Sequence, residues 1–545
     1  MRIYKMCMTY IKKYKMPIML LIFISVLSNS VTIISPFIIG NFIDMLVDNP
    51  SLDDILRFCL IFASLNFFRI ISGYTTAKIY TKIQTHMGYG FNSDLIQHTQ
   101  RLPISYFHKK DLVFLSQIEN TDTNKLIIFC ITSIQNLLIN LLYLIATTII
   151  ILSLNLFASV AIIVFLGLYI ISYCLFRKPL YNISREFSET QATFFSKSYE
   201  QFRYIKYIKS NSIYLDFKAE LDKSFKKLFD TAMKSQKINY YFSSSDNIIV
   251  MLMQISLFII GGIQIIEGSF TIGMFTIFMS YFSIMINSVK FFFNFGKTYQ
   301  DALVSYDRIQ NILSQQPQHN GIEKLHNINS IEIENLFFKY EENERSVLNK
   351  LNINFTKGNI YGITGANGSG KSTLMDIILG LYIDEFDGSI KFNNNDIKDL
   401  DMDFLRQTHI KVSLQEPTLL NENIAYNIGL KHELTGEELA KIKVLTKTVG
   451  LDKYINKLDN GLDTVISAFN NNISGGEKQK ISILKVLFSN SDLMIFDEPT
   501  SALDINSIKL FKEHLNSIKK DKIIIIISHS EMIIDLFDTI YPLSK

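Results

Sequence analysis

The sequence contains no tryptophan and only four cysteines among its 545 residues. The missing tryptophan is consistent with a skewed overall composition. The cysteines are Cys7, Cys59, Cys130 and Cys174; no pair has a metal-ligand spacing, and no Cys/His cluster accompanies them. We interpret them as reduced packing residues and expect no catalytic cysteine. The net charge is only +3, and this lack of a large basic excess argues against a nucleic-acid partner.

Apolar residues are clustered in the first part of the chain, and the mean hydropathy is positive at +0.19. Six apolar stretches are near or above the roughly 20 residues that cross a bilayer as a helix. A very apolar soluble core is the alternative, but six separate runs favour an all-α membrane domain over residues 1–313. The stretches are Ile18–Ile43, Ile55–Tyr74, Leu126–Ser153, Leu156–Phe176, Asn247–Ile266 and Thr271–Phe295.

Charged residues predict the orientation of these spans. Residues 1–16 carry five basic residues and no acidic one, which predicts a cytoplasmic N-terminus. The two long inner connections are basic and helix-like, so we expect the spans to continue into the cytoplasm. A short helix at each tip, near Arg101–Phe107 and Tyr204–Asn211, would dock on the second domain. Arg69 and Lys290 lie within or near apolar runs, where they would either line a substrate path or support helix packing near the membrane edge.

A glycine-rich phosphate loop follows a linker, 314–330, and opens the helix of a second domain, 331–545. It matches the pattern G-x-x-x-x-G-K-[ST] without a mismatch. Glycines allow backbone N–H groups to approach phosphate oxygens, and the helix N-terminus adds its dipole. Lys371 would reach the β- and γ-phosphates of ATP, and Ser372 would bind Mg²⁺. The predicted nucleotide-binding residues here are Gly365, Ala366, Asn367, Gly368, Ser369, Gly370, Lys371, Ser372 and Thr373.

Acidic and polar side chains follow the later strand-like runs of this domain. Asp497 ends one such run and suits the Mg²⁺ shell, while Glu498 suits polarising the attacking water. His529 ends the next run and would contact the γ-phosphate and hold Glu498 in place. Gln415 follows another run and would touch Mg²⁺ or water. A strand capped by solvated acids is the alternative interpretation.

A second anion site is predicted where Ser474, Gly475, Gly476 and Glu477 open a helix. One nucleotide needs only one phosphate loop, so this site indicates the γ-phosphate of a nucleotide held by another chain. Asp504 would organise the facing subunit, and Tyr340 would stack on adenine.

Together these residues resemble the ABC transporter superfamily, and their order resembles an ABC exporter half-transporter. The resemblance identifies Tyr340 as the A-loop, 365–372 as Walker A, Gln415 as the Q-loop, 474–477 as the signature, Asp497 and Glu498 as Walker B, Ser501–Asp504 as the D-loop and His529 as the switch. The sequence departs from the family pattern at Ile473 and Glu477, both in the signature. It also departs from the pattern at Ser467 and Ala468, because exporters have at these positions a Gly-Glu pair that contacts the tip helices.

The resemblance implies a P-loop α/β ATPase of ABC type that uses ATP and Mg²⁺, pairs with itself or a sister half-transporter, and sits as a multi-pass protein among the lipids of the cell membrane. It implies ATP-driven export of an amphipathic or apolar solute, such as a peptide, lipid or drug-like molecule, by alternating access. Three alternatives stay open: a heterodimer subunit with a degenerate partner, an importer using the exporter fold, and a soluble-type ATPase that shares this domain. The solute itself is not indicated by the sequence.

Overall fold

The computed structural model of this protein describes residues 2–47, 50–108, 115–116, 118–154, 156–340, 345–466 and 473–543. The chain divides into two compact units. Unit one comprises Met1–Gln100 and Lys110–Gln316, and unit two comprises Arg101–Lys109 and Pro317–Lys545. The short segment at 101–109 therefore groups with the C-terminal part of the chain, although unit one flanks it on both sides in sequence.

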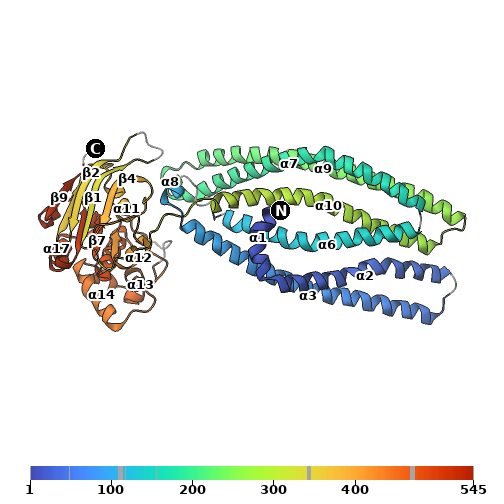
Figure 1. The fold of residues 1–545 in the computed structure, drawn as a ribbon, viewed down its shortest axis with the longest axis horizontal. Coiled ribbons are helices and arrows are strands. Elements are labelled where there is room, and N and C mark those ends of the chain that lie inside the picture. Colours follow the sequence, from blue (N-terminus) through green and yellow to red (C-terminus); the bar gives the residue numbers. More distant parts are fainter. Residues whose placement is uncertain are drawn as a thin grey trace. The chain divides into compact units, whose positions relative to one another are not determined.

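Unit one is built from helices (Figure 1). They are α1 (Arg2–Lys13), α2 (Lys15–Val47), α3 (Leu52–Gln100), α6 (Thr123–Leu154), α7 (Leu156–Arg203), α8 (Ile205–Asn211), α9 (Tyr214–Ile266) and α10 (Ile272–Leu313), with a π-helical turn, η1 (Ile118–Asp122), before α6. Helix α7 packs along α9, α6 along α10, and α2 along both α3 and α10. As the sequence predicts, the long helices continue well beyond the apolar stretches.

The surface of unit one has the composition of a membrane protein. Within the described residues, five helices are long and apolar enough to cross a membrane. The fourth predicted span, Leu156–Phe176, lies in α7, but many of its side chains fall outside the described residues. Large apolar side chains face outward, with Phe23 62%, Ile70 67% and Ile259 57% exposed. Such exposure is unfavourable in water and favourable against lipid.

Two glycines allow α2 and α10 to touch backbone to backbone. A Cβ built on Gly273 would lie 2.1 Å from the carbonyl oxygen of Gly40. One turn further along α2, Asp44 accepts hydrogen bonds from the Gly273 N–H and the Thr271 hydroxyl, each at 2.7 Å. Asp44 therefore satisfies donors at the start of α10 and fixes the register of the crossing.

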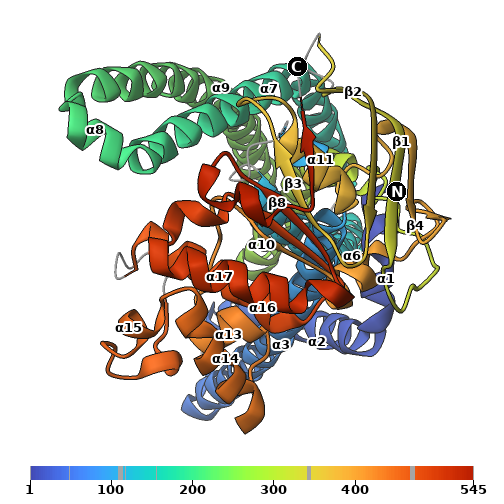
Figure 2. The same cartoon turned by 90° about the vertical axis from the view of Figure 1, so that its left-hand side faces the viewer.

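Unit two combines two sheets with surrounding helices (Figure 2). Its strands are β1 (Ser330–Phe338), β2 (Leu348–Thr356), β3 (Ile360–Thr364), β4 (Phe386–Phe392), β5 (Asn395–Asp396), β6 (Ile410–Ser413), β7 (Leu493–Asp497), β8 (Ile523–Ile527) and β9 (Thr539–Pro542). Its helices are α4 (Ile104–His108), α11 (Lys371–Ile378), α12 (Met402–Thr408), α13 (Ile424–Gly429), α14 (Gly436–Thr448), α15 (Asp452–Ile455), α16 (Gly475–Ser489) and α17 (Ile505–Ile518), with 3-10 turns at Gly461–Asp463, Pro499–Ala502, Lys519–Asp521 and Glu531–Leu536.

The parallel sheet has the strand order β6-β7-β8-β3-β9, and an antiparallel sheet has the order β2-β1-β4-β5. Strand β8 consists of five isoleucines, all buried, as expected for a parallel strand covered on both faces. Ile523, Ile525 and Ile527 join the core shared with α11 and the antiparallel sheet. Ile524 and Ile526 join the core shared with α16 and α17. Because β6, β7, β8 and β3 are parallel, their carboxyl ends meet at one edge.

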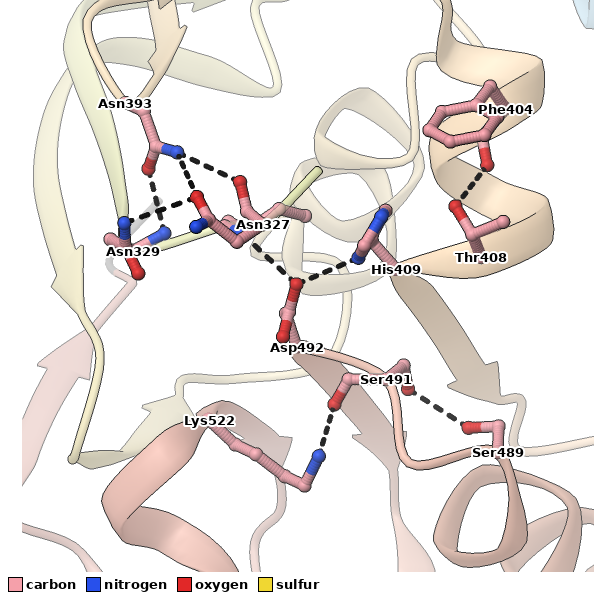
Figure 3. A network of polar contacts seen from close by, with 11 residues as sticks. Asn327, Asn329, Asn393, Phe404, Thr408, His409, Ser489, Ser491, Asp492 and Lys522 are labelled. Carbon is pink, nitrogen blue, oxygen red and sulfur yellow. Dashed lines mark hydrogen bonds and ion pairs between the residues drawn. The ribbon is translucent and has the colours of Figure 1, made fainter. Parts of the chain in front are cut away.

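The opposite edge of the parallel sheet is held by a polar network (Figure 3). Asp492, just before β7, accepts hydrogen bonds from the Ile328 N–H at 3.1 Å and from His409 Nδ1 at 2.8 Å. Nearby, the Asn393 side chain accepts from the Asn329 N–H at 2.7 Å. These contacts tie the chain entering β1 to the amino ends of β6 and β7, away from the edge that carries the predicted site.

Candidate functional site

The phosphate loop connects β3 to α11 at the carboxyl edge of the parallel sheet, where ligands bind in open α/β sheets. Three of its residues, Gly365, Gly368 and Gly370, have φ angles of +148°, +75° and +92°. Only glycine adopts these values without strain. A Cβ on Gly365 would also lie 2.3 Å from the Leu543 carbonyl oxygen. The backbone conformation therefore requires glycine at all three positions, and the lack of room for a side chain requires it at Gly365 as well.

The lysine of this loop is almost completely buried. Lys371 is 9% exposed, and its Nζ donates to the carbonyl oxygens of Gly365 at 2.8 Å and Ala366 at 3.1 Å. The buried Ser369 Oγ has no hydrogen-bond partner among the described residues. A buried ammonium beside an unsatisfied hydroxyl, at a helix N-terminus, fits a phosphate group. Ser372 and Thr373 follow on α11, Ser372 exposed and Thr373 buried.

The predicted acids and the histidine come together at the same edge. Asp497 ends β7, and Glu498 follows it with a left-handed φ of +48°. The Ser528 hydroxyl, just after β8, donates to Glu498 Oε2 at 3.3 Å. His529 Nε2 lies 3.8 Å from Glu498 Oε1. The predicted pairing of His529 with Glu498 is therefore present, and Ser528 adds a contact that sequence reasoning did not assign.

The backbone of Glu498 is held by α16. Its carbonyl oxygen accepts from the Gln479 side-chain amide at 2.8 Å and from the Ser501 hydroxyl at 2.9 Å. Ser501 is also within 2.9 Å of Gln479 Oε1. The role of Gln479 was missed by the sequence analysis. Its signal was a polar residue on the buried face of a helix, which requires a hydrogen-bond partner.

Ser474 begins α16 with a complete capping box. Its Oγ accepts from the Glu477 N–H at 3.3 Å, and Glu477 Oε2 accepts from the Ser474 N–H at 2.7 Å. Ser474 and Gly475 are exposed, Gly476 is half-buried, and no described hydrogen bond or ion pair joins the four to the phosphate loop. The neighbouring segment with Ser467 and Ala468 lies outside the described residues.

Asp504 caps α17 by accepting from the Ser507 N–H at 2.8 Å, and this contact lowers the pKa of the Asp504 carboxyl. It lines one groove with Glu498, Ser501 and His529. The D-loop acid, the proposed base and the switch histidine thus share one surface.

Two other predicted residues lie beside the loop's own elements. The Tyr340 hydroxyl is 2.9 Å from the Thr373 Oγ1 on α11. Gln415 is exposed just after β6. Their contacts with a nucleotide stay predictions.

Burial, and then the neighbouring Glu498, raise the pKa of Asp497, while Lys371 lowers it. A buried carboxylate next to a second one fits a cation. No group of three His, Cys, Asp or Glu side chains in the described ranges could hold a metal alone. The predicted Mg²⁺ ligands are Asp497, Ser372 and Gln415, which would hold the ion together with water and phosphate oxygens. When bound, Mg²⁺ neutralises charge on the phosphates.

Two family models match successive parts of the chain. Residues 18–289 match the ABC transporter transmembrane region, and residues 348–501 match the ABC transporter model. The chain belongs to the ABC transporter family. As a half-transporter of exporter type, it joins one helical membrane domain to one ATPase domain and couples ATP hydrolysis to transport.

Relatives of this ABC transporter carry export names. It is 25% identical to YgaD of Bacillus subtilis, whose name describes a multidrug export ATP-binding/permease protein, over 97% of this chain and 92% of that one. It is 30% identical to the alpha-hemolysin translocation ATP-binding protein HlyB of Escherichia coli, over 52% of this chain and 40% of that one. The solved structure of a bacterial Atm1-family ABC exporter with ATP bound matches with a TM-score of 0.86 and 18% identity, covering 97% of this chain and 94% of that one.

Proposed function

We propose that this half-transporter works as a dimer and exports an amphipathic or apolar solute, such as a peptide, lipid or drug-like molecule, by alternating access. The observation that carries the proposal is a division within the ATPase unit. Lys371, Asp497, Glu498 and His529 lie at one sheet edge, whereas the exposed, capped helix start at Ser474 has no described hydrogen bond to the loop. A helix N-terminus attracts anions, so Ser474 suits the γ-phosphate of a nucleotide held by a second chain.

Each residue at the sheet edge has a proposed role in hydrolysis. Lys371 binds the β- and γ-phosphates, Ser372 and Asp497 hold Mg²⁺, and Glu498 orients and polarises the attacking water. His529 contacts the γ-phosphate and keeps Glu498 in position. The second chain contributes Ser474 and its N-terminal N–H groups, so that hydrolysis requires both copies.

The membrane unit uses the free energy of ATP hydrolysis for transport, and its orientation determines the direction of that transport. Basic residues near the N-terminus and in the inner connections support a cytoplasmic N-terminus and a cytoplasmic ATPase unit. The apolar outward faces of α2, α3 and α9 contact lipid. The export names of relatives that match nearly the whole chain support outward transport.

Complementation tests the shared site. Lys371→Ala and Ser474→Arg are each expected to abolish vanadate-dependent trapping of nucleotide when expressed alone. Co-expressed with different affinity tags, a mixed pair contains one site with an intact phosphate loop and an intact signature, so trapping should return to at most about half of the parent level. If each chain used its own Ser474, the mixed pair would stay inactive, and the dimer proposal would be wrong.

The purified parent chain tests the choice of partner. Trapping by the parent alone supports a homodimer, and its absence would indicate that a sister half-transporter is needed. Inside-out vesicles test direction: ATP-dependent accumulation of a fluorescent amphiphile in the lumen is expected, and ATP-dependent release of preloaded dye would contradict export.

A further inference from the structure

Residues 101–108 pack onto the ATPase unit through α4. Ile104 packs against the core that contains α11 and β3. The Ser105 hydroxyl donates to Glu385 Oε1 at 2.6 Å, and the Arg101 carbonyl accepts from the Gln318 N–H at 2.7 Å. These three contacts hold α4 in place without touching any predicted nucleotide-binding residue.

A fourth contact leads toward the nucleotide site. The Tyr382 hydroxyl is 3.3 Å from His108 Nε2, the last residue of α4. Tyr382 is 3% exposed, and its ring meets the Tyr340 ring edge-on with centroids 5.9 Å apart. Phe338 packs against both rings, at 4.9 Å from Tyr340 and 5.0 Å from Tyr382. The three aromatic side chains therefore form one packed cluster beneath α4.

The cluster continues onto the phosphate-loop helix. The Tyr340 hydroxyl contacts Thr373, which directly follows the proposed Mg²⁺ ligand Ser372. Burial, and then the Tyr340 side chain, raise the pKa of Tyr382, so its phenol stays protonated and its hydroxyl can hydrogen-bond to His108. A continuous path of contacts thus runs from α4 through two tyrosines to α11.

We propose that His108 and Tyr382 are positioning residues that transmit nucleotide occupancy from Tyr340 and Thr373 to α4. The inference rests on the proposed function, in which adenine stacks on Tyr340. Fixing the Tyr340 ring against adenine constrains the adjacent Tyr382 ring and orders the hydroxyl that bonds His108. Unit one flanks α4 on both sides in sequence, so a change in the order of α4 reaches the transmembrane helices through the chain.

Hydrogen exchange of the full-length protein in nanodiscs tests this path, with MgATP added to Glu498→Gln protein to prevent turnover. In the Glu498→Gln protein, which is the parent of this series, ATP should slow amide exchange in residues 101–108 by about two- to tenfold. This is the change that the net free energy of one hydrogen bond gives. Tyr382→Phe removes only a hydroxyl and keeps the ring packing. It should bind a fluorescent ATP analogue within about twofold of the parent affinity, yet lose the ATP-dependent slowing. His108→Phe, at the other end of the bond, should behave in the same way.

Ser105→Ala is the matched control, because it removes the hydrogen bond of α4 to Glu385 and leaves the contact between Tyr382 and His108 in place. It should speed exchange of residues 101–108 equally with and without ATP and leave the ATP-dependent slowing intact. The inference is overturned if Tyr382→Phe and His108→Phe retain the parent response, or if Ser105→Ala abolishes it as well, since the contact would then be structural only. Failure of the parent to bind the ATP analogue would instead contradict the proposed function.

Discussion

Replacing Glu498 by glutamine gives the sharpest test of the hydrolytic site. The glutamine side chain has nearly the same shape, and its amide oxygen can still accept from Ser528. The Gln479 and Ser501 hydrogen bonds reach the Glu498 backbone carbonyl, so they are unaffected by the change. What is lost is the negative charge, and with it the ability to polarise water.

The structure separates the effect on turnover from the effect on folding. The His529–Glu498 contact is 3.8 Å long and the His529 side chain is 44% exposed, so its loss should cost less than about 1 kcal/mol of unfolding free energy. A general base contributes about 10²- to 10⁴-fold to rate, or about 3–5 kcal/mol of activation free energy. Glu498→Gln should therefore lose at least about a hundredfold in kcat while its unfolding transition and its affinity for an ATP analogue stay near the parent values.

A phosphate-release assay on purified protein in lipid measures kcat, and Glu513→Gln provides the matched control. Glu513 is an exposed glutamate on α17 that lines no described site, so the same change there should leave kcat unaltered. The reasoning is refuted if Glu498→Gln hydrolyses ATP within about threefold of the parent rate. Loss of ATP binding together with kcat would refute it too, because Glu498 would then act in binding or folding.

Three further predictions concern the ATPase unit. Ser474→Ala should lower its unfolding free energy by about 1 kcal/mol through loss of the cap, measured by thermal unfolding against Ser474→Thr, which should retain most of the stability. Gly370→Ala should weaken binding of a fluorescent ATP analogue by more than about tenfold, because its φ is +92° and the new Cβ would lie 2.8 Å from a Leu348 methyl; unchanged affinity would contradict the loop geometry. Burial, and then Asp497, raise the pKa of Asp376 from 3.8 to about 6, so its protonated form favours folding below pH 4 and this contribution is lost as pH rises through 6. Asp376→Asn should therefore be more stable than the parent by about 1–2 kcal/mol above pH 7, after discounting for partial exposure, with the difference disappearing below pH 4 in thermal scans; a difference independent of pH would disprove the assignment.

Much of the hydrolytic site could be predicted because a parallel sheet brings together residues that are distant in sequence. Glu498 and His529 each follow a short apolar run, and neighbouring parallel strands place such positions at one edge. The glycine pattern at 365–370 was equally informative, since positive φ angles leave few alternatives. The extension of the transmembrane helices beyond their apolar stretches was also predicted, from the length and helical character of the inner connections.

Contacts between short local elements and distant ones could not be predicted. The hydrogen bond between Tyr382 and His108 joins residues 274 positions apart, and nothing in either local pattern selects the other. Gln479 is one of several polar residues in its helix, and only the folded structure shows that its partner is the Glu498 carbonyl oxygen. These contacts depend on how packed elements meet, which a single sequence does not encode as a local pattern.

The Gly40–Gly273 crossing has a mechanical consequence for the membrane unit. With no side chain between the two backbones and Asp44 bonded across the junction, α2 and α10 cannot slide along each other at this end without breaking both Asp44 hydrogen bonds. The two helices are therefore held together at one end. Any large rearrangement must come from bending farther along the helices or from rotation of the pair as one rigid body. Adding one methyl group at either glycine would push α2 and α10 apart, and the pair would lose the contact about which it rotates.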